Sequence, residues 1–377
     1  MKGCALALPT ESKWPLSIMR TKFASALIAA LLLAGCGGTG GAGVPVNIPG
    51  GVLTQSKTTT QAEAQSAMDP VQEDSLSAVL FDGTAGNTLD IARQNVHLNS
   101  VGCRNRVERT VTQVSPTEVI YETKYFYDQA CTQLAKDVVA DVNQPSPSSE
   151  TIIRTATWFN HAALQLGQRK SNFAVTGAPG NFSAVITSDF FVGSSTSPES
   201  QRGHQITVSP QSQGVYNVAG NGGRVYNDNA PSIDESFGGQ GQLQNVTATV
   251  DGSGDVTFAG SHLETISKGA LGSITLSNAP PFTVSGGTVL GNRTATGSVE
   301  FDNMGNLVSL TVNVALISGG SAVLTSSGTP PSVSVNGTIM NAAGQVLATF
   351  TVDQFGDGII TYANGQQGII IDWHVIS

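Results

Sequence analysis

Apolar and polar residues alternate along much of the chain after about residue 95. Successive side chains of a strand point to opposite faces, so this period of two predicts strands that bury one face. Residues 106–114 and 119–127 show the pattern on either side of a turn at residues 115–118, and residues 151–158 and 182–192 show it again. Such strands, connected by short turns, predict an antiparallel sheet.

Four short segments of the form [DN]-x-x-G-[DNQ] interrupt the alternation in the C-terminal part. They cover residues 251–255, 302–306, 341–345 and 353–357. The side chain of the first Asp or Asn caps a type I turn, and the Gly takes the left-handed conformation that reverses the chain. This turn chemistry favours hairpins over the stacked coils of a parallel β-helix.

Local residue types add three further expectations. The Asn-Gly pair at 364–365 predicts a tighter hairpin turn, and residues 368–376 predict one last strand. Residues 143–148 predict a loop, because their two prolines lack the N–H that a strand interior needs.

The predicted fold class is all-β and mostly antiparallel, with a meander of β-hairpins forming sandwich or barrel-like domains. A minor helix is expected at residues 74–81, ahead of the predicted strands. With 43 Gly and only 12% charged residues, the composition is typical of β-proteins with many tight turns. Residues 73–235 are expected to form an N-terminal β-rich domain, and residues 236–377 a C-terminal domain of repeated hairpins.

The N-terminal region carries the strongest motif of the chain. A cationic stretch precedes the apolar run 23–34, which is the order of a secretory signal peptide. The run is too short for a membrane-spanning helix, which needs about 20 apolar residues. It ends in Leu33-Ala34-Gly35-Cys36, which resembles the lipobox of bacterial lipoproteins. The resemblance implies cleavage before Cys36, diacylation of its thiol and acylation of the new amino terminus.

Residues 1–35 are therefore expected to be a signal peptide, with Met19 as the true start because the stretch before it is unusually long. Residues 36–72, rich in Gly, Thr, Gln and Ala, predict a lipid-anchored flexible tether. In lipoproteins an Asp after the lipidated Cys favours the inner membrane. This chain has Gly37, which favours the outer membrane, at its periplasmic face or at the cell surface.

The charge balance argues against nucleic-acid binding. The chain has a net charge of −9, and removal of residues 1–35 takes away four of its 18 Lys and Arg residues but only one of its 27 Asp and Glu residues. Nucleic-acid binding needs cations that displace counterions from phosphates, and no Lys or Arg follows Arg293. We therefore expect no nucleic-acid partner, and a membrane contact through the lipid anchor.

Two cysteines remain for the folded part of the chain. Cys4 lies in the discarded region and Cys36 is the lipid site, which leaves Cys103 and Cys131. A hairpin centred on residues 115–118 pairs residue i with 233 − i, which places Cys103 opposite position 130, beside Cys131. In an oxidising compartment we expect a disulfide across the open end of this hairpin.

Candidate metal and catalytic chemistry is sparse. Asp251 with Asp255, and Asp353 with Asp357, are weak calcium candidates, but turn chemistry alone explains these carboxylates. The five histidines lack a zinc spacing, and the chain has no nucleophile-elbow, P-loop or dinucleotide motif. No catalytic residue, bound metal or other cofactor is predicted.

Two further groups have a structural and a functional interpretation. Asp372 and His374, two apart on the predicted last strand, would suit a base and its orienting partner, but a surface pair is favoured. Tyr121, Tyr125 and Tyr127 share one face of a strand, where a half-buried core face is favoured over a platform for a sugar or a peptide.

These observations favour a lipid-anchored cell-envelope protein, a non-enzymatic binding or structural module displayed from the outer membrane with a protein or glycan ligand. The alternative is an envelope hydrolase acting on glycans or peptides, which needs paired carboxylates in a cleft. Distant carboxylates brought together in an aromatic-lined pocket would favour that alternative.

Overall fold

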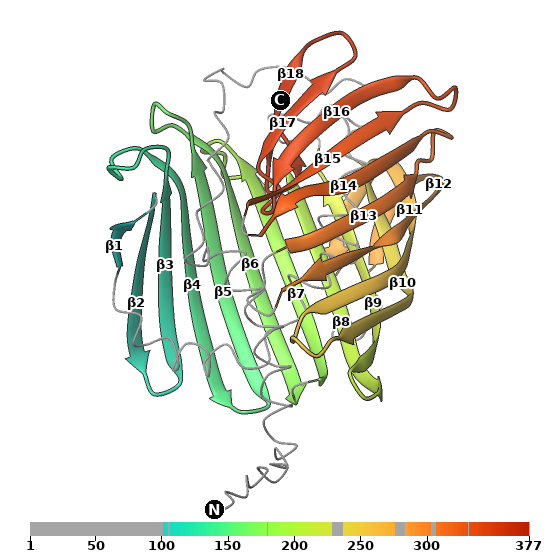
Figure 1. Cartoon of the computed structure of the whole chain (residues 1–377). Helices are drawn as coiled ribbons and strands as arrows, with labels where there is room; N and C mark the ends of the chain where they lie inside the picture. Colours follow the sequence, from blue (N-terminus) through green and yellow to red (C-terminus); the bar gives the residue numbers. More distant parts are fainter. Residues whose placement is uncertain are drawn as a thin grey trace, which may run out of the picture.

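The computed structural model describes residues 101–104, 106–178, 180–227, 237–275, 283–302, 307–330 and 332–376. These residues form nineteen strands and no helix, and each strand pairs antiparallel with the next one along the chain (Figure 1). The predicted all-β meander is confirmed. Within these ranges no helix is long and apolar enough to cross a membrane. The predicted helix at 74–81, the signal peptide, Cys36 and the tether lie outside the described residues.

The strands of the first half are β1 (Val101–Arg104), β2 (Val107–Ser115), β3 (Glu118–Phe126), β4 (Leu134–Ser146), β5 (Ser149–Phe159), β6 (Gln165–Ala178), β7 (Asn181–Val192), β8 (Ser200–Ser212) and β9 (Val215–Tyr226). Those of the second half are β10 (Phe237–Val250), β11 (Val256–Thr275), β12 (Thr283–Phe301), β13 (Leu307–Ala315), β14 (Ser321–Thr329), β15 (Ser332–Met340), β16 (Val346–Asp353), β17 (Gly358–Tyr362), β18 (Gln367–Ile371) and β19 (His374–Val375).

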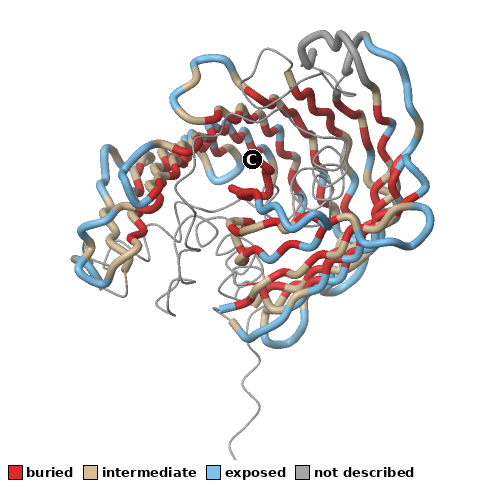
Figure 2. The backbone as a smooth tube through the Cα atoms, turned by 90° about the horizontal axis from the view of Figure 1, so that it is seen from above, coloured by how far each residue is buried: buried red, intermediate tan, exposed pale blue. Residues whose placement is uncertain are grey.

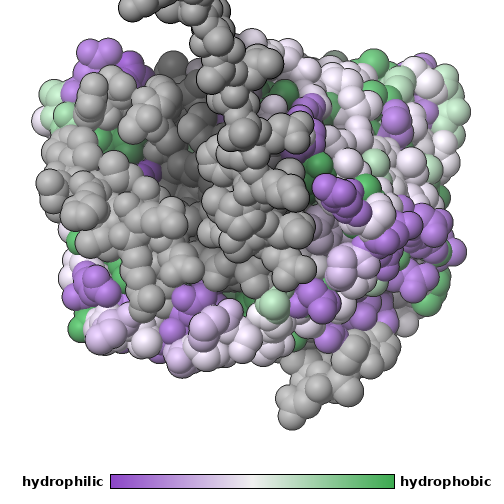
Figure 3. Space-filling model, turned by 60° about the horizontal axis from the view of Figure 1, so that its bottom comes forward, coloured by the Kyte–Doolittle hydropathy of each residue, from purple (hydrophilic) through white to green (hydrophobic). Residues whose placement is uncertain are grey.

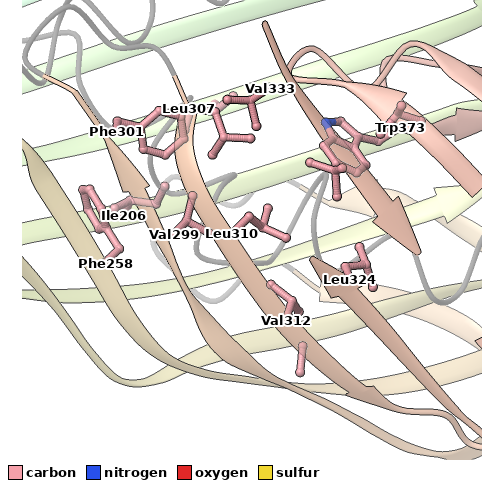
Figure 4. Close-up of a cluster of buried hydrophobic side chains, with 14 of the residues drawn as sticks. Ile206, Phe258, Val299, Phe301, Leu307, Leu310, Val312, Leu324, Val333 and Trp373 are labelled. Carbon is pink, nitrogen blue, oxygen red and sulfur yellow. The ribbon is translucent and has the colours of Figure 1, made fainter. Parts of the chain in front are cut away.

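The sheet curves so strongly that its two halves face each other (Figures 1 and 2). Side chains alternate between a buried inner face and a more exposed outer face: on β13, Leu310 and Val312 are buried, whereas Thr311 and Asn313 are exposed. The inner faces of the two halves share one hydrophobic core, part of which is shown in Figure 4. Ile206 of β8 belongs to this core together with residues of β11–β15. Burial of this shared apolar surface favours the curved arrangement over an open sheet.

The predicted boundary near residue 235 falls in the connection between β9 and β10, outside the described residues. β9 and β10 pair with each other, with Tyr226 opposite Phe237 and Val215 opposite Thr249. Hydrogen bonding therefore continues across the boundary, and the core includes residues from both sides. The division into two separately folding domains stays a prediction.

The predicted five-residue turns are confirmed at 251–255, 341–345 and 353–357. In each turn the N–H of the first residue donates to the carbonyl of the fifth, and the Gly N–H donates to the carbonyl of the first. The glycines at the fourth position have φ of 88°, 76° and 80°. Residues 303–306 of the fourth predicted turn lie outside the described residues.

The same backbone turn also forms where the sequence pattern was incomplete. It occurs at 160–164, 316–320 and 362–366. The Asn-Gly pair at 364–365 therefore belongs to the common five-residue turn, and the prediction of a tighter turn there was wrong. At 160–164 the left-handed position is taken by Ala163, with φ 59°, while the Asn160 side chain accepts hydrogen bonds from two backbone N–H groups.

The loop predicted at residues 143–148 is wrong, because β4 continues to Ser146. The pairing of β4 with β5 changes register between Asn143 and Ser146, so Pro145 lies in an irregular stretch of the strand. A bulge leaves a residue without ladder hydrogen bonds, which is where a strand tolerates proline.

The single last strand predicted at residues 368–376 is also wrong. β18 and β19 form a hairpin joined by Asp372 and Trp373, with Ile371 opposite His374. Both turn residues have positive φ, 49° and 64°. Two left-handed residues are what a two-residue type I′ turn requires, although Asn and Gly are the usual choices.

The disulfide between Cys103 and Cys131 is confirmed, with a Cα–Cα distance of 5.9 Å. The reasoning behind it needs a correction, because β2 and β3 pair one residue out of the expected register: Val107 lies opposite Tyr125. An irregularity beside the turn causes this shift. Cys103 lies on β1, which folds back along β2, and Cys131 lies in the connection between β3 and β4. The disulfide therefore ties the first strand to that connection.

Replacement of both residues (Cys103→Ser with Cys131→Ser) is expected to lower the free energy of unfolding by about 3 kcal/mol, because the bond closes a loop of 28 residues in the unfolded chain. Urea denaturation of the double variant, beside the wild type with and without reductant, measures this loss. Peptide mapping without reductant should show one linked peptide. Two free alkylated thiols in the wild type would contradict the pairing.

Candidate functional site

Charged side chains gather on the inner face of the sheet around the terminal hairpin β18–β19. The C-terminus lies inside the curve of the sheet in Figure 2, and the side chains of Glu199 and His374 are fully buried. Arg169 on β6 is 1% exposed. Buried charges are stable only when they are paired, so their partners define the site.

One ion pair and one histidine–carboxylate hydrogen bond connect the terminal hairpin to the first half of the sheet. Nε2 of His374 lies 2.6 Å from Oε1 of Glu199, a residue that directly precedes β8. The guanidinium of Arg169 pairs with the carboxylate of Asp372. Because the partners of the hairpin lie far from it in the sequence, on β6 and just before β8, these contacts hold the hairpin against β6–β8. We call these four residues, together with Asp357 and Lys136, the terminal cluster.

Asp357 connects the turn between β16 and β17 to the same cluster. Its Oδ1 accepts the backbone N–H of Asp372 at 2.7 Å. Its Oδ2 accepts hydrogen bonds from Nζ of Lys136 at 3.2 Å and from the indole N–H of Trp158 at 3.0 Å. One carboxylate thereby joins β4, β5 and the terminal hairpin.

The turn at residues 353–357 also supports Asp372 and Trp373, the two residues of the terminal hairpin with left-handed backbone conformation. Trp373 donates its backbone N–H to the carbonyl of Gly356 at 2.9 Å, and its indole packs against the Cα of that glycine, where a Cβ would overlap the ring. A left-handed conformation is unfavourable for a bulky residue such as Trp, and it persists only where surrounding contacts require it. Gly356 and Asp357 supply those contacts.

Aromatic rings surround the charged groups of the terminal cluster. The ring centroid of His374 lies 4.4 Å from that of Phe190 and 5.4 Å from that of Tyr226. Nζ of Lys136 lies 4.8 Å from the ring centroid of Trp158. These rings limit the access of water and strengthen the electrostatic interactions beside them.

A second buried group lies on β9, β11 and β12. Arg224 and Arg293 both pair with Oε2 of Glu264, and none of the three side chains is more than 1% exposed. Glu264 lies over Gly239 of β10, where a Cβ would overlap its carboxylate. His262, two residues before Glu264, lies over Gly241 in the same way. These glycines provide the space that large inward-facing polar side chains need.

Two carboxyl groups in this region have pKa shifts of opposite direction. Burial alone would raise the pKa of Asp372, but nearby cations, with Arg169 first, outweigh it and hold the pKa below its ordinary value. Burial, followed by the negative charge of Asp357, raises the pKa of Asp353 to about 7. Near neutral pH, Asp372 is therefore ionised, whereas Asp353 is partly protonated.

A carboxyl with a raised pKa beside a second carboxyl can form a general acid–base pair. In this structure Asp353 and the neighbouring Asp357 both serve the fold. Oδ1 of Asp353 accepts the backbone N–H groups of Phe355 and Asp357, which caps its turn, and Asp357 faces a lysine and an indole. The arrangement stabilises the turn and its contacts with β4 and β5.

The four calcium candidates lie in two turns that hydrogen bonds already explain. Asp251 accepts the N–H groups of Ser253 and Asp255, in the same way as Asp353 in its own turn. Among the described residues, no group of three or more His, Cys, Asp or Glu side chains is placed to hold a metal ion. The four carboxylates remain weak calcium candidates.

The other candidates are placed as follows. The expectation that Asp372 and His374 form a surface pair is wrong, because both turn inward, where each pairs with a distant partner. Tyr121 and Tyr125 are buried in the core, as favoured from the sequence. Tyr127 stacks on His161 with ring centroids 3.9 Å apart, and its hydroxyl donates to a backbone carbonyl.

Sequence analysis missed the inward-facing arginines and glutamates. A signal for them was present in the alternation: on β11, His262 and Glu264 share the parity of the buried Phe258 and Ile266. Polar residues at core positions of a strand indicate buried pairing. Their partners could not be named, because Glu199 and His374 are 175 residues apart in the sequence.

Asp372→Asn is expected to lower the free energy of unfolding by about 2 kcal/mol at pH 7, because Asn tolerates the left-handed turn but leaves Arg169 without this charge partner. The lowered pKa means that this stabilisation is present above about pH 4 and is lost as the pH falls below it. Denaturation at pH 7 and pH 3 tests this. Asp251→Asn, in an exposed turn, is the control and should change little. Equal stability of Asp372→Asn and the wild type at pH 7 would contradict the prediction.

Asp353→Asn is expected to act in the opposite direction. Because its pKa is raised, Asp353 does not lower the free energy of unfolding below about pH 4, where it is protonated in the folded and the unfolded chain. Its destabilising effect grows as the pH rises through about 7. The variant should match the wild type at pH 4 and exceed its free energy of unfolding by about 2 kcal/mol at pH 8. Asn341 accepts the same two backbone N–H groups at the first position of the 341–345 turn, so the substitution Asp353→Asn should keep the side-chain cap of its turn. A pH-independent difference would refute this explanation.

Comparisons with protein-family models, with curated proteins and with solved structures found no match to this chain.

Proposed function

We propose that this chain is a lipid-anchored protein of the bacterial cell envelope whose β-sheet body is a non-enzymatic binding or structural module. The observation that carries the proposal is the order of a cationic stretch, an apolar run and Leu33-Ala34-Gly35-Cys36 at the N-terminus. Acylated Cys36 would hold the protein at the outer membrane. The segment 36–72 would separate the sheet from the lipid surface.

The disulfide supports an exported location. Disulfides persist in oxidising compartments such as the periplasm and the cell surface, and are rare in a reducing cytosol. The bond joins Cys103, in the first described strand, to Cys131. It therefore strengthens the end of the sheet that follows the tether, where a pull on the anchor would first act.

The arrangement of the buried charges supports a non-enzymatic role over a hydrolase. A glycosidase needs two carboxyl groups about 5–10 Å apart that both face a substrate. In the terminal cluster each carboxylate faces a partner from the chain itself: Glu199 faces His374, Asp372 faces Arg169, and Asp357 faces Lys136. These contacts stabilise the molecule, and they engage the carboxyl groups that a glycosidase would need to face its substrate.

Cys36→Ala is expected to release the protein from membranes, because neither the acyl chains nor the processed amino terminus would form. Membrane fractionation of the wild type and the variant, with mass spectrometry of the mature N-terminus, measures this. The wild type should carry an acylated Cys36 and co-fractionate with the outer membrane. A wild-type chain that begins elsewhere, or that is soluble, would overturn the proposal.

A further inference from the structure

The outward sides of the two halves of the sheet differ in charge. On β3 and β4 the outer face carries Glu122, Lys124 and Asp137, and Lys124 lies opposite Asp137. On β12–β16 the outer face carries Glu300 as its one charged residue between the ends of the strands, within residues 292–302, 307–330 and 332–352. We call the outward side of β12–β16 the hydroxyl face.

Hydroxyl and amide side chains form a continuous row across the hydroxyl face. The strand register places these residues next to one another in the order Ser298, Thr311, Thr325, Asn336 and Thr351. Each of the five side chains is at least partly exposed. Neighbouring strands lie about 4.8 Å apart, so the row presents hydrogen-bonding groups at a regular spacing.

A second row runs parallel to the first, one side-chain repeat along the strands. It contains Thr296, Asn313, Val323, Thr338 and Thr349 in strand order. Side chains two residues apart on a strand are separated by about 6.6–6.8 Å, so the two rows form a lattice of donors and acceptors. Val323 is the single apolar member, and it is 36% exposed.

Hydrogen bonds within the lattice orient some of its groups. Thr351 donates its hydroxyl to Oδ1 of Asn336 at 2.9 Å. Nδ2 of Asn336 donates to the hydroxyl of Ser327, also at 2.9 Å. Groups held in this way lose less rotamer freedom when a ligand binds.

The composition of the hydroxyl face selects the class of its ligand. It has no Lys or Arg, because none follows Arg293, so neither nucleic acid nor an anionic lipid surface is complementary to it. Protein interfaces depend on Trp, Tyr and Arg anchors, and the two rows contain none of these. Hydroxyl and amide groups both donate and accept, which matches the hydroxyls of a neutral sugar.

A polymer suits this face better than a free sugar. One hydrogen bond exchanged with water contributes only about 0.5–1.5 kcal/mol, and the face is not a pocket that would enclose a small ligand. A chain of sugars laid along the rows would engage many groups at once, each held near the next by the polymer backbone. Figure 3 shows the described surface from the bottom of Figure 1, where hydrophilic and hydrophobic residues are interspersed.

We infer that the hydroxyl face binds a neutral polysaccharide. This inference rests on the proposed function, because it names the ligand class of the displayed module. Its ligand is recognised by many weak hydrogen bonds, so binding changes little with salt concentration and is disrupted by charge placed within the rows.

The test uses the full mature lipoprotein in detergent on an array of immobilised polysaccharides. Cellulose, β-1,3-glucan and mannan are the neutral probes, and alginate is the anionic one. The double variant Thr311→Asp with Thr351→Asp places two charges in the first row. The matched control, Thr151→Asp with Thr176→Asp, places the same charges at exposed outer-face positions of β5 and β6.

We expect the wild type and the control to bind at least one neutral probe with similar affinity, and the row variant to bind it about tenfold or more weakly. Binding that is equal in both double variants, binding to alginate alone, or no binding to any neutral probe would overturn the inference. Circular dichroism and thermal unfolding of the two variants show whether both are folded. Absence of polysaccharide binding by a wild-type protein that fractionates with the outer membrane would refute this inference and leave the proposed function standing.

Discussion

A sheet in which each strand pairs only with its neighbours in sequence has two free edges, and its own hydrogen bonds do not bring the halves together. In this protein the halves share the pairing of β9 with β10, and their facing inner surfaces meet through side chains: a shared apolar core, and the contacts of Arg169 with Asp372 and of Glu199 with His374. The apolar core supplies most of the favourable free energy but no fixed geometry. The paired charges are directional, so they determine how the second half is placed against the first.

The parts of the fold predicted from sequence depend on neighbouring residues. Alternation and turn residues act over fewer than ten positions, and both the antiparallel meander and the five-residue turns were predicted from them. One error arises where distant groups change a local preference. Residues 368–376 read as one strand, but Asp357 and Gly356 stabilise a turn within them that their own residue types do not favour. The pairing of Arg169 with Asp372 depends on how the halves meet, which no local pattern encodes.

Charged polar residues and uncharged polar residues occupy different faces of this molecule. Ionised groups occupy the inner face, where each has partners, and the outer face of β2–β7, where water solvates them. The outer face of β12–β16 is polar but almost uncharged. A neutral polar surface is soluble without long-range repulsion or attraction, so contact with another surface is decided by short-range hydrogen bonding. The chain as a whole is acidic, so its net charge does not reveal that this face is almost uncharged.

The 175 residues that separate Glu199 from His374 have a consequence for folding. In a sequential meander each hairpin can form soon after its two strands emerge, because its contacts are local. Asp372 and His374, which contact Arg169 and Glu199 of the first half, are synthesised long after these partners. Until the terminal hairpin forms, these contacts are missing, and the edge of the newest strand remains open to other chains. A chain cut before β18 would therefore expose that strand edge and lack the contacts between the terminal hairpin and the first half.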